Sequence, residues 1–153
     1  MIVTFDTNIL VYAVDFEAGP RHQRAADLVE RAIRNRLGII TLQALGEFFN
    51  VLTRKMRIEA RAAAELVEGW MAALPVHSAG EGELADAMRV VREHRIQFWD
   101  AMLWAAARRA GVRYLLTEDL QDGRILEGVT FLDPFAPSNA ALIDRHLPVI
   151  AIQ

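Results

Sequence analysis

Short apolar runs alternate with longer amphipathic segments along the chain, and this pattern predicts a regular exchange of strands and helices. The apolar runs favour buried strands at residues 2–5, 39–41, 76–78, 113–117 and 129–132. Between them, apolar side chains recur at helical spacing and predict helices at residues 8–15, 21–35, 42–56, 59–74, 81–94 and 99–110. Glycine and proline mark the breaks, as at Gly19-Pro20, and Gly123 and Gly128 predict loops.

Strands that alternate with helices predict an α/β fold with a parallel sheet and helices on both of its faces. The length of 153 residues fits one domain with a substantial core. In the helix at 42–56, the apolar residues on one face are expected to be buried: Leu45, Phe48, Phe49, Leu52 and Met56. In sheets of this kind, ligands lie at the carboxyl ends of the strands.

The composition narrows the class of protein. Hydrophobic residues make up 53% of the chain and charged residues 24%, which is typical of a folded globular protein and not of a disordered one. No apolar run approaches the ~20 residues of a membrane span, and the N-terminus has no signal-peptide pattern. The chain has no cysteine. Disulfides, thiolate metal sites and cysteine nucleophiles are therefore excluded, and a cytoplasmic location is expected.

The charge is more informative in its distribution than in its sum. A net charge of −3 gives no global attraction for nucleic acid. Arginines nevertheless cluster at residues 31–36, 54–61 and 108–113, and Lys55 is the only lysine. Guanidinium groups suit phosphates, whereas the ordinary alternative is that these clusters lie on solvated helix faces.

Two acids follow predicted strands. Asp6 ends the first strand, where it suits either the N-cap of the next helix or a site at the sheet edge. Asp119 follows the strand that ends at Thr117, in an acidic stretch with Glu118 and Asp122. This stretch is either a surface loop with Asx-type turns or a place where a hydroxyl and a carboxylate bind a ligand together.

Two further acids lie on predicted helices. Glu47 falls opposite the apolar face of its helix, where it is either solvated or directed into a cleft with Arg54 two turns further along. Asp100 heads an otherwise apolar stripe formed with Leu103, Trp104 and Ala107. A carboxylate in such a position is costly unless it is paired, protonated or bound to a metal, although a helix first turn also favours an acid by about 0.3–1 kcal/mol.

Together the four acids can meet at one end of the predicted sheet. Carboxylates gathered at one point repel each other and stay ionised only with a cation. An all-oxygen ligand set, without cysteine and with no histidine within two residues of any of the four, favours Mg²⁺ or Mn²⁺ over Zn²⁺. Such a site can activate water for in-line displacement at phosphorus.

Several stretches in this order resemble one known family, the PIN domain, and most closely its VapC group of toxins. They are DTN after the first strand, the helical Glu47, FWDA at the start of a late helix, and LLTEDLQDG after the next strand. The resemblance spans residues 1–134. It implies a three-layer α/β fold whose central parallel sheet has about five strands flanked by helices.

The same resemblance implies the roles of individual residues. Asp6, Glu47, Asp100 and Asp119 match the four catalytic acids, and Asp6, Asp100 and Asp119 would hold Mg²⁺ or Mn²⁺. Asn8 and Thr117 match supporting positions. Glu118 competes with Asp119 for the fourth acid. Asp122 is either a peripheral, water-mediated ligand or a turn former, and Arg54 is a candidate contact for the substrate phosphate.

The resemblance also implies a function. PIN proteins use Mg²⁺ or Mn²⁺ to hydrolyse RNA phosphodiester bonds, and VapC-like members pair as homodimers and are silenced by an antitoxin protein. We therefore expect an endoribonuclease and toxin, with Glu47 orienting the attacking water or binding a second metal. A PIN-like scaffold that binds RNA or protein without cutting is the alternative. A haloacid-dehalogenase-like phosphatase would need a second aspartate where Asn8 stands.

Two features stay outside this match. Phe98 and Trp99 can stack on a base, but core packing is the expectation for an aromatic pair beside a buried helix. Residues 135–153 form a C-terminal extension that we expect to pack on the domain or on a dimer partner. Within it, Ser138 is expected to cap a short helix at residues 139–146, followed by an apolar end at residues 149–152.

Overall fold

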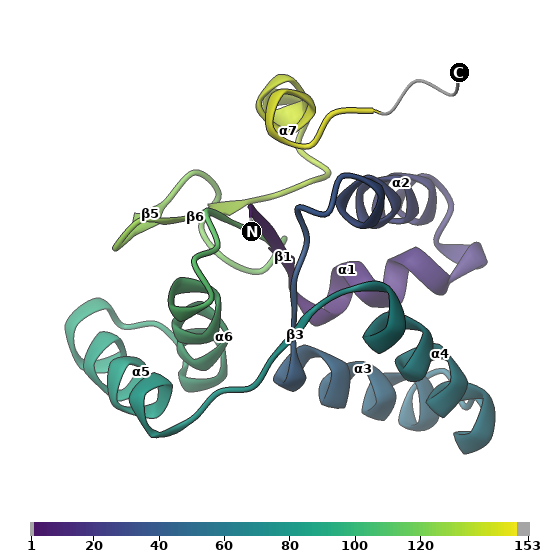
Figure 1. The fold of residues 1–153 in the computed structure, drawn as a ribbon, viewed down its shortest axis with the longest axis horizontal. Coiled ribbons are helices and arrows are strands. Elements are labelled where there is room, and N and C mark those ends of the chain that lie inside the picture. Colours follow the sequence, from purple (N-terminus) through teal and green to yellow (C-terminus); the bar gives the residue numbers. More distant parts are fainter. Residues whose placement is uncertain (1, 150–153) are drawn as a thin grey trace.

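The structure is a computed structural model in which residues 2–149 are described, and Figure 1 shows how strands and helices alternate along the chain. Its strands are β1 (Val3–Phe5), β2 (Ile40–Thr41), β3 (Val76–His77), β4 (Tyr114–Leu116), β5 (Ile125–Leu126) and β6 (Val129–Leu132). Its α-helices are α1 (Thr7–Val14), α2 (Pro20–Arg34), α3 (Leu42–Arg54), α4 (Ala60–Ala73), α5 (Glu81–His94), α6 (Phe98–Arg109) and α7 (Ala140–His146). Short 3₁₀ helices lie at Phe16–Ala18 and Pro137–Asn139.

The main sheet has four strands in the order β1-β4-β6-β5. β1, β4 and β6 are parallel, whereas β5 is antiparallel to β6. β2 and β3 form a separate parallel pair, which continues the main sheet only through a bridge between Val3 and Gly38. The expected parallel architecture is confirmed, but the expected single sheet of about five parallel strands is wrong in its strand count. The two-residue strands β2 and β3 are too short to extend the main ladder.

In the β5–β6 hairpin, β6 matches the predicted strand at residues 129–132, whereas β5 lies in a stretch expected to be loop. The turn of the hairpin consists of Glu127 and Gly128, whose φ angles are 43° and 89°. Two consecutive positive φ angles are typical of a type I′ turn, which matches the twist of two antiparallel strands. Glycine adopts this conformation readily, so Gly128 marks a tight hairpin at the edge of the sheet.

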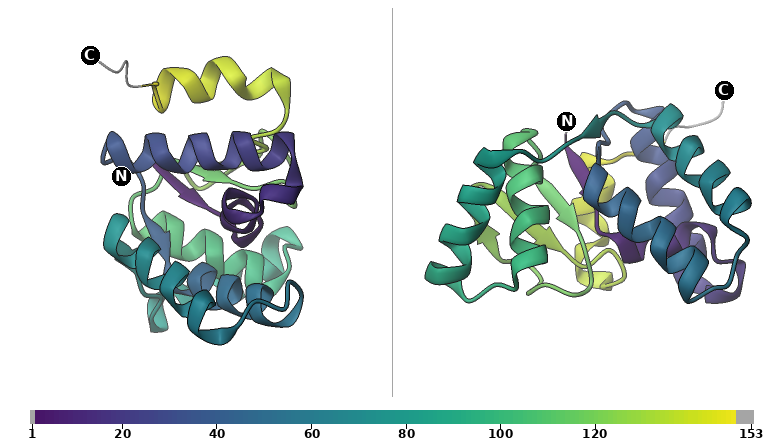
Figure 2. Two further views of the ribbon diagram at one scale, coloured as in Figure 1. Left: turned by 90° about the vertical axis from the view of Figure 1, so that its right-hand side faces the viewer. Right: turned by 90° about the horizontal axis from the view of Figure 1, so that it is seen from below.

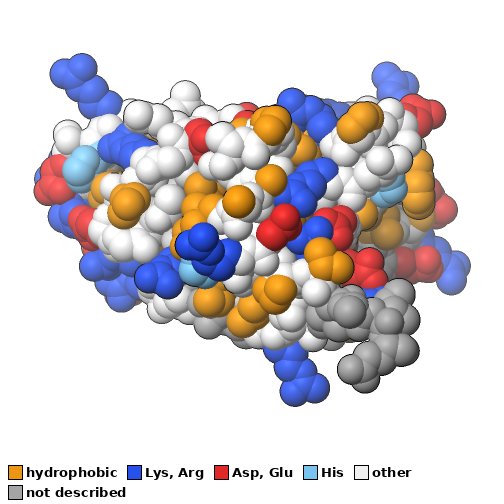
Figure 3. Space-filling view, turned by 90° about the horizontal axis from the view of Figure 1, so that it is seen from above, with side chains coloured by type: hydrophobic (Ala, Val, Ile, Leu, Met, Phe, Trp, Pro, Cys, Tyr) orange, Lys and Arg blue, Asp and Glu red, His pale blue; other side chains and the backbone are white. Residues whose placement is uncertain are grey.

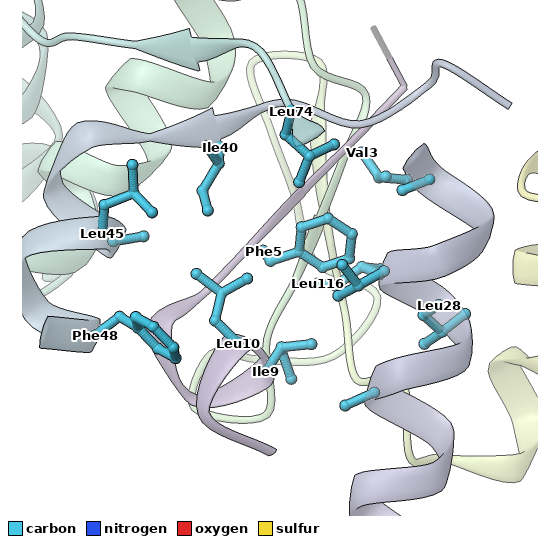
Figure 4. Close-up of a cluster of buried hydrophobic side chains, with 14 of the residues drawn as sticks. Val3, Phe5, Ile9, Leu10, Leu28, Ile40, Leu45, Phe48, Leu74 and Leu116 are labelled. Carbon is cyan, nitrogen blue, oxygen red and sulfur yellow. The ribbon is translucent and has the colours of Figure 1, made fainter. Parts of the chain in front are cut away.

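Helices cover both faces of the sheet, and each face has its own hydrophobic cluster (Figures 1 and 2). One cluster joins the sheet to α1, α2, α3 and α7, and the other joins it to α5 and α6. Side chains alternate between them along β4, because Tyr114 and Leu116 belong to the first cluster and Leu115 to the second. Figure 4 shows Phe5, Ile9 and Leu10 in the first cluster. The expected three-layer α/β class is thus confirmed.

Helix α3 buries most of the face that the sequence predicts. Leu45, Phe48 and Leu52 are fully buried between α1 and α4, and Met56 packs at the margin of the cluster. Phe49 departs from the prediction, because 36% of its side chain is exposed. It lies where α3 meets α4 in an open groove that Met71 also lines, so the buried arc of α3 is narrower than its apolar stripe.

The C-terminal segment packs on the domain. Ile143 and Leu147 of this segment are buried in the first cluster. Arg31 of α2 binds Asp144 at 2.6 Å and donates to the Leu147 carbonyl at 3.4 Å. The expected cap at Ser138 is wrong: α7 begins at Ala140, its N-cap residue is Asn139, and no side chain caps it. A 3₁₀ turn at Pro137–Asn139 takes up the residues where that cap was expected.

The apolar end predicted at residues 149–152 lies outside the described residues except for Val149. Within residues 2–149, no helix combines the length and apolar character needed to cross a membrane.

Candidate active site

Two neighbouring parallel strands end side by side and bring Asp6 and Thr117 together. β1 and β4 pair with Phe5 opposite Leu116, so the next residue of each strand leaves the sheet at the same edge. The Thr117 hydroxyl donates to Asp6 Oδ2 at 2.8 Å, and both residues are buried. Asp6 Oδ1 accepts the Thr7 N–H at 2.7 Å, so Asp6 is also the N-cap of α1. Both interpretations of Asp6 therefore apply: it caps α1, and it lies at the edge of the sheet where β1 ends.

The loop after β4 separates its two candidate acids. Asp119 Oδ2 accepts a hydrogen bond from Asn8 Nδ2 at 2.5 Å, and the Asp119 N–H donates to Thr117 Oγ1 at 3.1 Å. Glu118 points elsewhere: it accepts the Tyr12 hydroxyl at 2.7 Å and forms an ion pair with Arg21. The structure thus joins Asp119, and not Glu118, to the Asp6 and Thr117 pair through Asn8 and its own backbone.

Glu47 reaches the same edge from α3. Its Oε2 accepts the Thr7 hydroxyl at 2.9 Å, and its Oε1 accepts Gln43 Nε2 at 2.8 Å. The bond to Thr7 links α3 to the first turn of α1, directly beside Asp6. Glu47 is exposed, as the solvated alternative requires, but its two hydrogen bonds fix it beside the strand ends.

Asp100 lies in the first turn of α6 and is half-buried. Among the described residues, no group donates a hydrogen bond to its carboxylate. The residue before it is tied to the Glu47 side chain, because Gln43 Nε2 also donates to the Trp99 carbonyl at 3.1 Å. Asp100 is within electrostatic range of Asp119 and Glu47, and its oxygen atoms carry no hydrogen bond among the described residues.

The electrostatics of Asp6 reflect this gathering of acids. Burial, the largest cause, raises the pKa of Asp6 from 3.8 to about 6. The hydrogen bonds from Thr117 and Thr7 act against this rise, whereas the negative charges of Asp119 and Asp100 add to it. No lysine or arginine is among the main influences on this pKa.

Asp100 responds in the same direction. Burial raises its pKa first, and repulsion from Asp119 and Glu47 raises it further. Asp119 thus raises the pKa of both Asp6 and Asp100. Asp100 also raises the pKa of Asp6, and Glu47 raises that of Asp100. Like charges that sit within range of one another without a local cation form a site of high affinity for an added cation.

The donor set suits a hard divalent cation, because every candidate ligand is a carboxylate, hydroxyl or amide oxygen. Within residues 2–149, however, no three aspartate, glutamate or histidine side chains stand ready to hold one ion. Asp119 is bonded to Asn8, and Glu47 to Thr7 and Gln43. Binding of one ion by three of the acids therefore requires side-chain rotation, which the free carboxylate of Asp100 allows most easily.

Two of the sequence candidates are not brought into this group. Asp122 Oδ1 accepts the Asp133 N–H at 2.9 Å and Asn139 Nδ2 at 2.7 Å, so it serves the turn into the C-terminal segment. Arg54 lies at the exposed end of α3, about two turns from Glu47, and no hydrogen bond or ion pair among the described residues links it to an acid of the site.

The arginine clusters mostly follow the ordinary alternative. Arg108 and Arg109 pair with Asp86, and Arg31 with Asp27 and Asp144. On the face shown in Figure 3, basic and acidic side chains are interspersed and no single basic field forms.

Two residues of the site escaped the sequence analysis, and a third was expected in another environment. The two are Thr7 and Gln43, which hold Glu47. The sequence signal for Thr7 was its hydroxyl between Asp6 and Asn8, and the signal for Gln43 was its position on the polar side of the helix. Trp99 was expected to pack in the core, and this is wrong: 64% of it is exposed, and it meets Phe98 edge to face at 5.0 Å. Phe98 is 37% exposed.

The fold and the site define a class: an α/β protein with two acids at the carboxyl ends of parallel strands and two more on the helices α3 and α6. The sequence model of the PIN domain matches residues 3–123, and the protein belongs to the PIN domain family. A search of curated protein sequences finds no match.

Solved structures with the same fold include toxins of the VapC group. VapC20 of Mycobacterium tuberculosis, a sarcin–ricin loop cleaving toxin, is 21% identical with a TM-score of 0.60, over 76% of this chain and 89% of that one. A DNA-bound VapBC of Salmonella typhimurium is 18% identical with a TM-score of 0.65, over 88% and 98%. A VapBC2 of Rickettsia felis bound to a promoter DNA fragment is 15% identical with a TM-score of 0.64, over 86% and 97%. At these identities the similarity concerns the fold.

Proposed function

We propose that the protein is a metal-dependent endoribonuclease that hydrolyses RNA phosphodiester bonds. The observation that carries this proposal is that Asp6, Glu47, Asp100 and Asp119 lie within electrostatic range of one another: burial first, and then mutual repulsion, raise the pKa values of Asp6 and Asp100, and no basic residue is among the main influences on them. Membership of the PIN family supports it, as does the similarity in fold to a toxin that cleaves the sarcin–ricin loop.

The residues divide into three tasks. Asp6, Asp100 and Asp119 would hold Mg²⁺ or Mn²⁺, which supplies a Lewis acid for the scissile phosphate and lowers the pKa of water. Glu47 orients the attacking water. Thr117 and Asn8 keep Asp6 and Asp119 in place through the hydrogen bonds at 2.8 and 2.5 Å.

The experiment is cleavage of total RNA by purified protein with Mg²⁺, with Mn²⁺ and with EDTA. Asp100→Asn is the preferred variant, because no hydrogen bond from residues 2–149 holds its carboxylate and the fold should tolerate the amide. Loss of a residue that only hydrogen-bonds to a metal ligand already lowers activity by about 10–100-fold, so we expect at least a ~100-fold loss here. Asp122→Asn is the matched control, because Asp122 faces the C-terminal turn and not the site.

The outcomes separate the alternatives. Metal-dependent cutting by wild type and Asp122→Asn, but not by Asp100→Asn, is the expected result. Equal cutting by all three proteins would point to a contaminant and contradict the active site. Folded wild-type protein that cuts nothing in either metal would favour the PIN-like scaffold that binds without cleavage.

We further propose that this nuclease is the toxin of a toxin–antitoxin pair, that it forms a homodimer and that an antitoxin protein is its partner. Its fold is similar to those of VapBC proteins and of a toxin–antitoxin complex from Klebsiella pneumoniae. Expression in a bacterial host should arrest growth for wild type but not for Asp100→Asn, and unaffected growth would contradict the toxin role. The mass from light scattering tests the dimer, and a monomer would contradict it.

A further inference from the structure

Trp99 is the largest apolar side chain that the first turn of α6 exposes. Of the three tryptophans, Trp104 is fully buried and Trp70 is partly buried against Phe48, whereas Trp99 is 64% exposed. Large exposed apolar groups lose the hydrophobic stabilisation that burial would give them, about 1.5–3 kcal/mol for a large side chain. Packing leaves most of this indole uncovered, so its face is available to a ligand.

The backbone places Trp99 beside the acids. It directly precedes Asp100, and its carbonyl accepts a hydrogen bond from Gln43 Nε2. The same amide nitrogen donates to Glu47 Oε1 at 2.8 Å. A single side chain thus ties the backbone of Trp99 to the carboxylate proposed to orient water.

The surface beyond Trp99 is both aromatic and basic. Phe98 holds the indole edge to face, with an angle of 66° between the rings. On its other side Phe98 lines an open hollow of about 550 Å³ together with Met88, Val91 and Arg92. Arg92 is exposed, and among residues 2–149 it forms no ion pair, in contrast to Arg89 on the same helix.

An aromatic face followed by an unpaired cation is the arrangement that binds single-stranded nucleic acid. Bases stack on the ring whatever their sequence, at about 1–3 kcal/mol per base, and a cation follows the phosphates. We propose that a nucleobase next to the scissile phosphate stacks on Trp99, and that the strand continues over Phe98 towards Arg92. This inference rests on the proposed RNA cleavage, and it assigns Trp99 as a residue that positions substrate.

RNA binding and cleavage are both measured, so that the two proposals can fail separately. Binding is followed by fluorescence anisotropy of a labelled RNA of about 12 nucleotides with randomised sequence, a length within known single-strand sites. Cleavage is followed on one RNA that the wild type cuts, with and without abasic sites on either side of the cut bond. The variants are Trp99→Ala and Trp99→Phe, and Phe16→Ala is the control, an aromatic residue 85% exposed beyond the other end of α1.

The expected result is a rise in KM and Kd of about 5- to 150-fold for Trp99→Ala, with most affinity kept by Trp99→Phe and all of it by Phe16→Ala. Removal of the base should weaken RNA binding by the wild type by the same factor. It should not weaken binding by Trp99→Ala any further. If Trp99→Ala weakened binding relative to wild type by the same factor on abasic and on intact RNA, the stacking would be overturned, and an unchanged KM would overturn it as well.

Other results show which of the two proposals, RNA cleavage or base stacking, has failed. RNA binding that depends on Trp99 without any cleavage would contradict the nuclease and support the stacking. Cleavage with an unchanged KM for Trp99→Ala would support the nuclease and contradict the stacking. If Trp99→Ala binds RNA normally but changes the mass measured by light scattering, the indole is a protein contact and the inference is overturned. Absence of RNA binding by the wild type would contradict both proposals.

Discussion

Asp6 combines a structural task with the chemical one proposed for it. It caps α1 through the Thr7 N–H, and it also receives the Thr117 hydroxyl inside the sheet edge. These two bonds stabilise its ionised form, yet burial and the charges of Asp119 and Asp100 outweigh them and hold its pKa at about 6. The protein therefore keeps at this position a carboxylate that is unfavourable for folding, which is common where activity and stability conflict.

The first prediction concerns Asp6→Asn in EDTA. The folded-state pKa of about 6 lies above the unfolded value of 3.8, so the folded state retains a proton that the unfolded state loses between these pH values. Wild-type stability should therefore fall relative to the variant as pH rises from about 4 to 6, and the difference should then level off. The full shift corresponds to about 3 kcal/mol, so we expect Asp6→Asn to be more stable by about 1–3 kcal/mol at pH 7.

Thermal unfolding of both proteins at pH 4 and pH 7 measures this difference, and each comparison cancels the titration of groups outside the range of Asp6. A variant less stable than wild type at pH 7, or a difference that does not vary with pH, would contradict the prediction.

At this scale the sequence predicts acids better than their partners. Asp6 and Asp119 are predictable because each follows a strand, and the edge of a parallel sheet is shared by its strand ends. The bond from Thr7 to Glu47 joins residues 40 positions apart, and no local pattern encodes it. Trp99 was placed wrongly because helical spacing indicates a face but not whether a neighbouring element covers it.

Among the elements, helices were predicted closely and the sheet less so. The predicted helices at residues 8–15 and 99–110 correspond to α1 at Thr7–Val14 and α6 at Phe98–Arg109, shifted by one residue. Their apolar periodicity involves residues close together in the chain, so it can be recognised from the sequence alone. The β5–β6 hairpin and the short ladder of β2 and β3 depend on pairing between strands, which the sequence alone does not fix.

Helix α7 shows which contacts attach an element to the domain. The second prediction is that Ile143→Ala, at a side chain 4% exposed in the first cluster, lowers the free energy of unfolding by about 2–4 kcal/mol through lost burial and a cavity. Asp144→Asn on the same helix should cost less than about 1 kcal/mol, because the Asp144 side chain is 54% exposed in its pair with Arg31.

Urea unfolding measures both variants of α7, with an unchanged dependence on urea as the sign that the folded states are comparable. A neutral Ile143→Ala would contradict the packing described for α7. An Asp144→Asn as costly as Ile143→Ala would show that the ion pair, and not the apolar contact, holds the helix.

At the scale of the whole molecule, function depends on where the layers meet. The two hydrophobic clusters fix the helices on opposite faces of the sheet. Asp6 and Asp119 follow the strand ends, and α3 and α6 carry Glu47 and Asp100. The sequence predicts this class of architecture through its alternation of strands and helices. It does not give the side-chain orientations that separate Asp119 from Glu118, because these depend on Asn8, Tyr12 and Arg21 from other elements.

The central claim is that these acids form one divalent-cation site, and direct binding of Mn²⁺ followed by electron paramagnetic resonance tests it. The account predicts saturable binding by wild type and by Asp122→Asn. For Asp100→Asn it predicts affinity weakened by at least ~10-fold, because that change removes a ligand and not an outer partner. Identical Mn²⁺ binding by all three proteins, or no binding by the folded wild type, would contradict the claim.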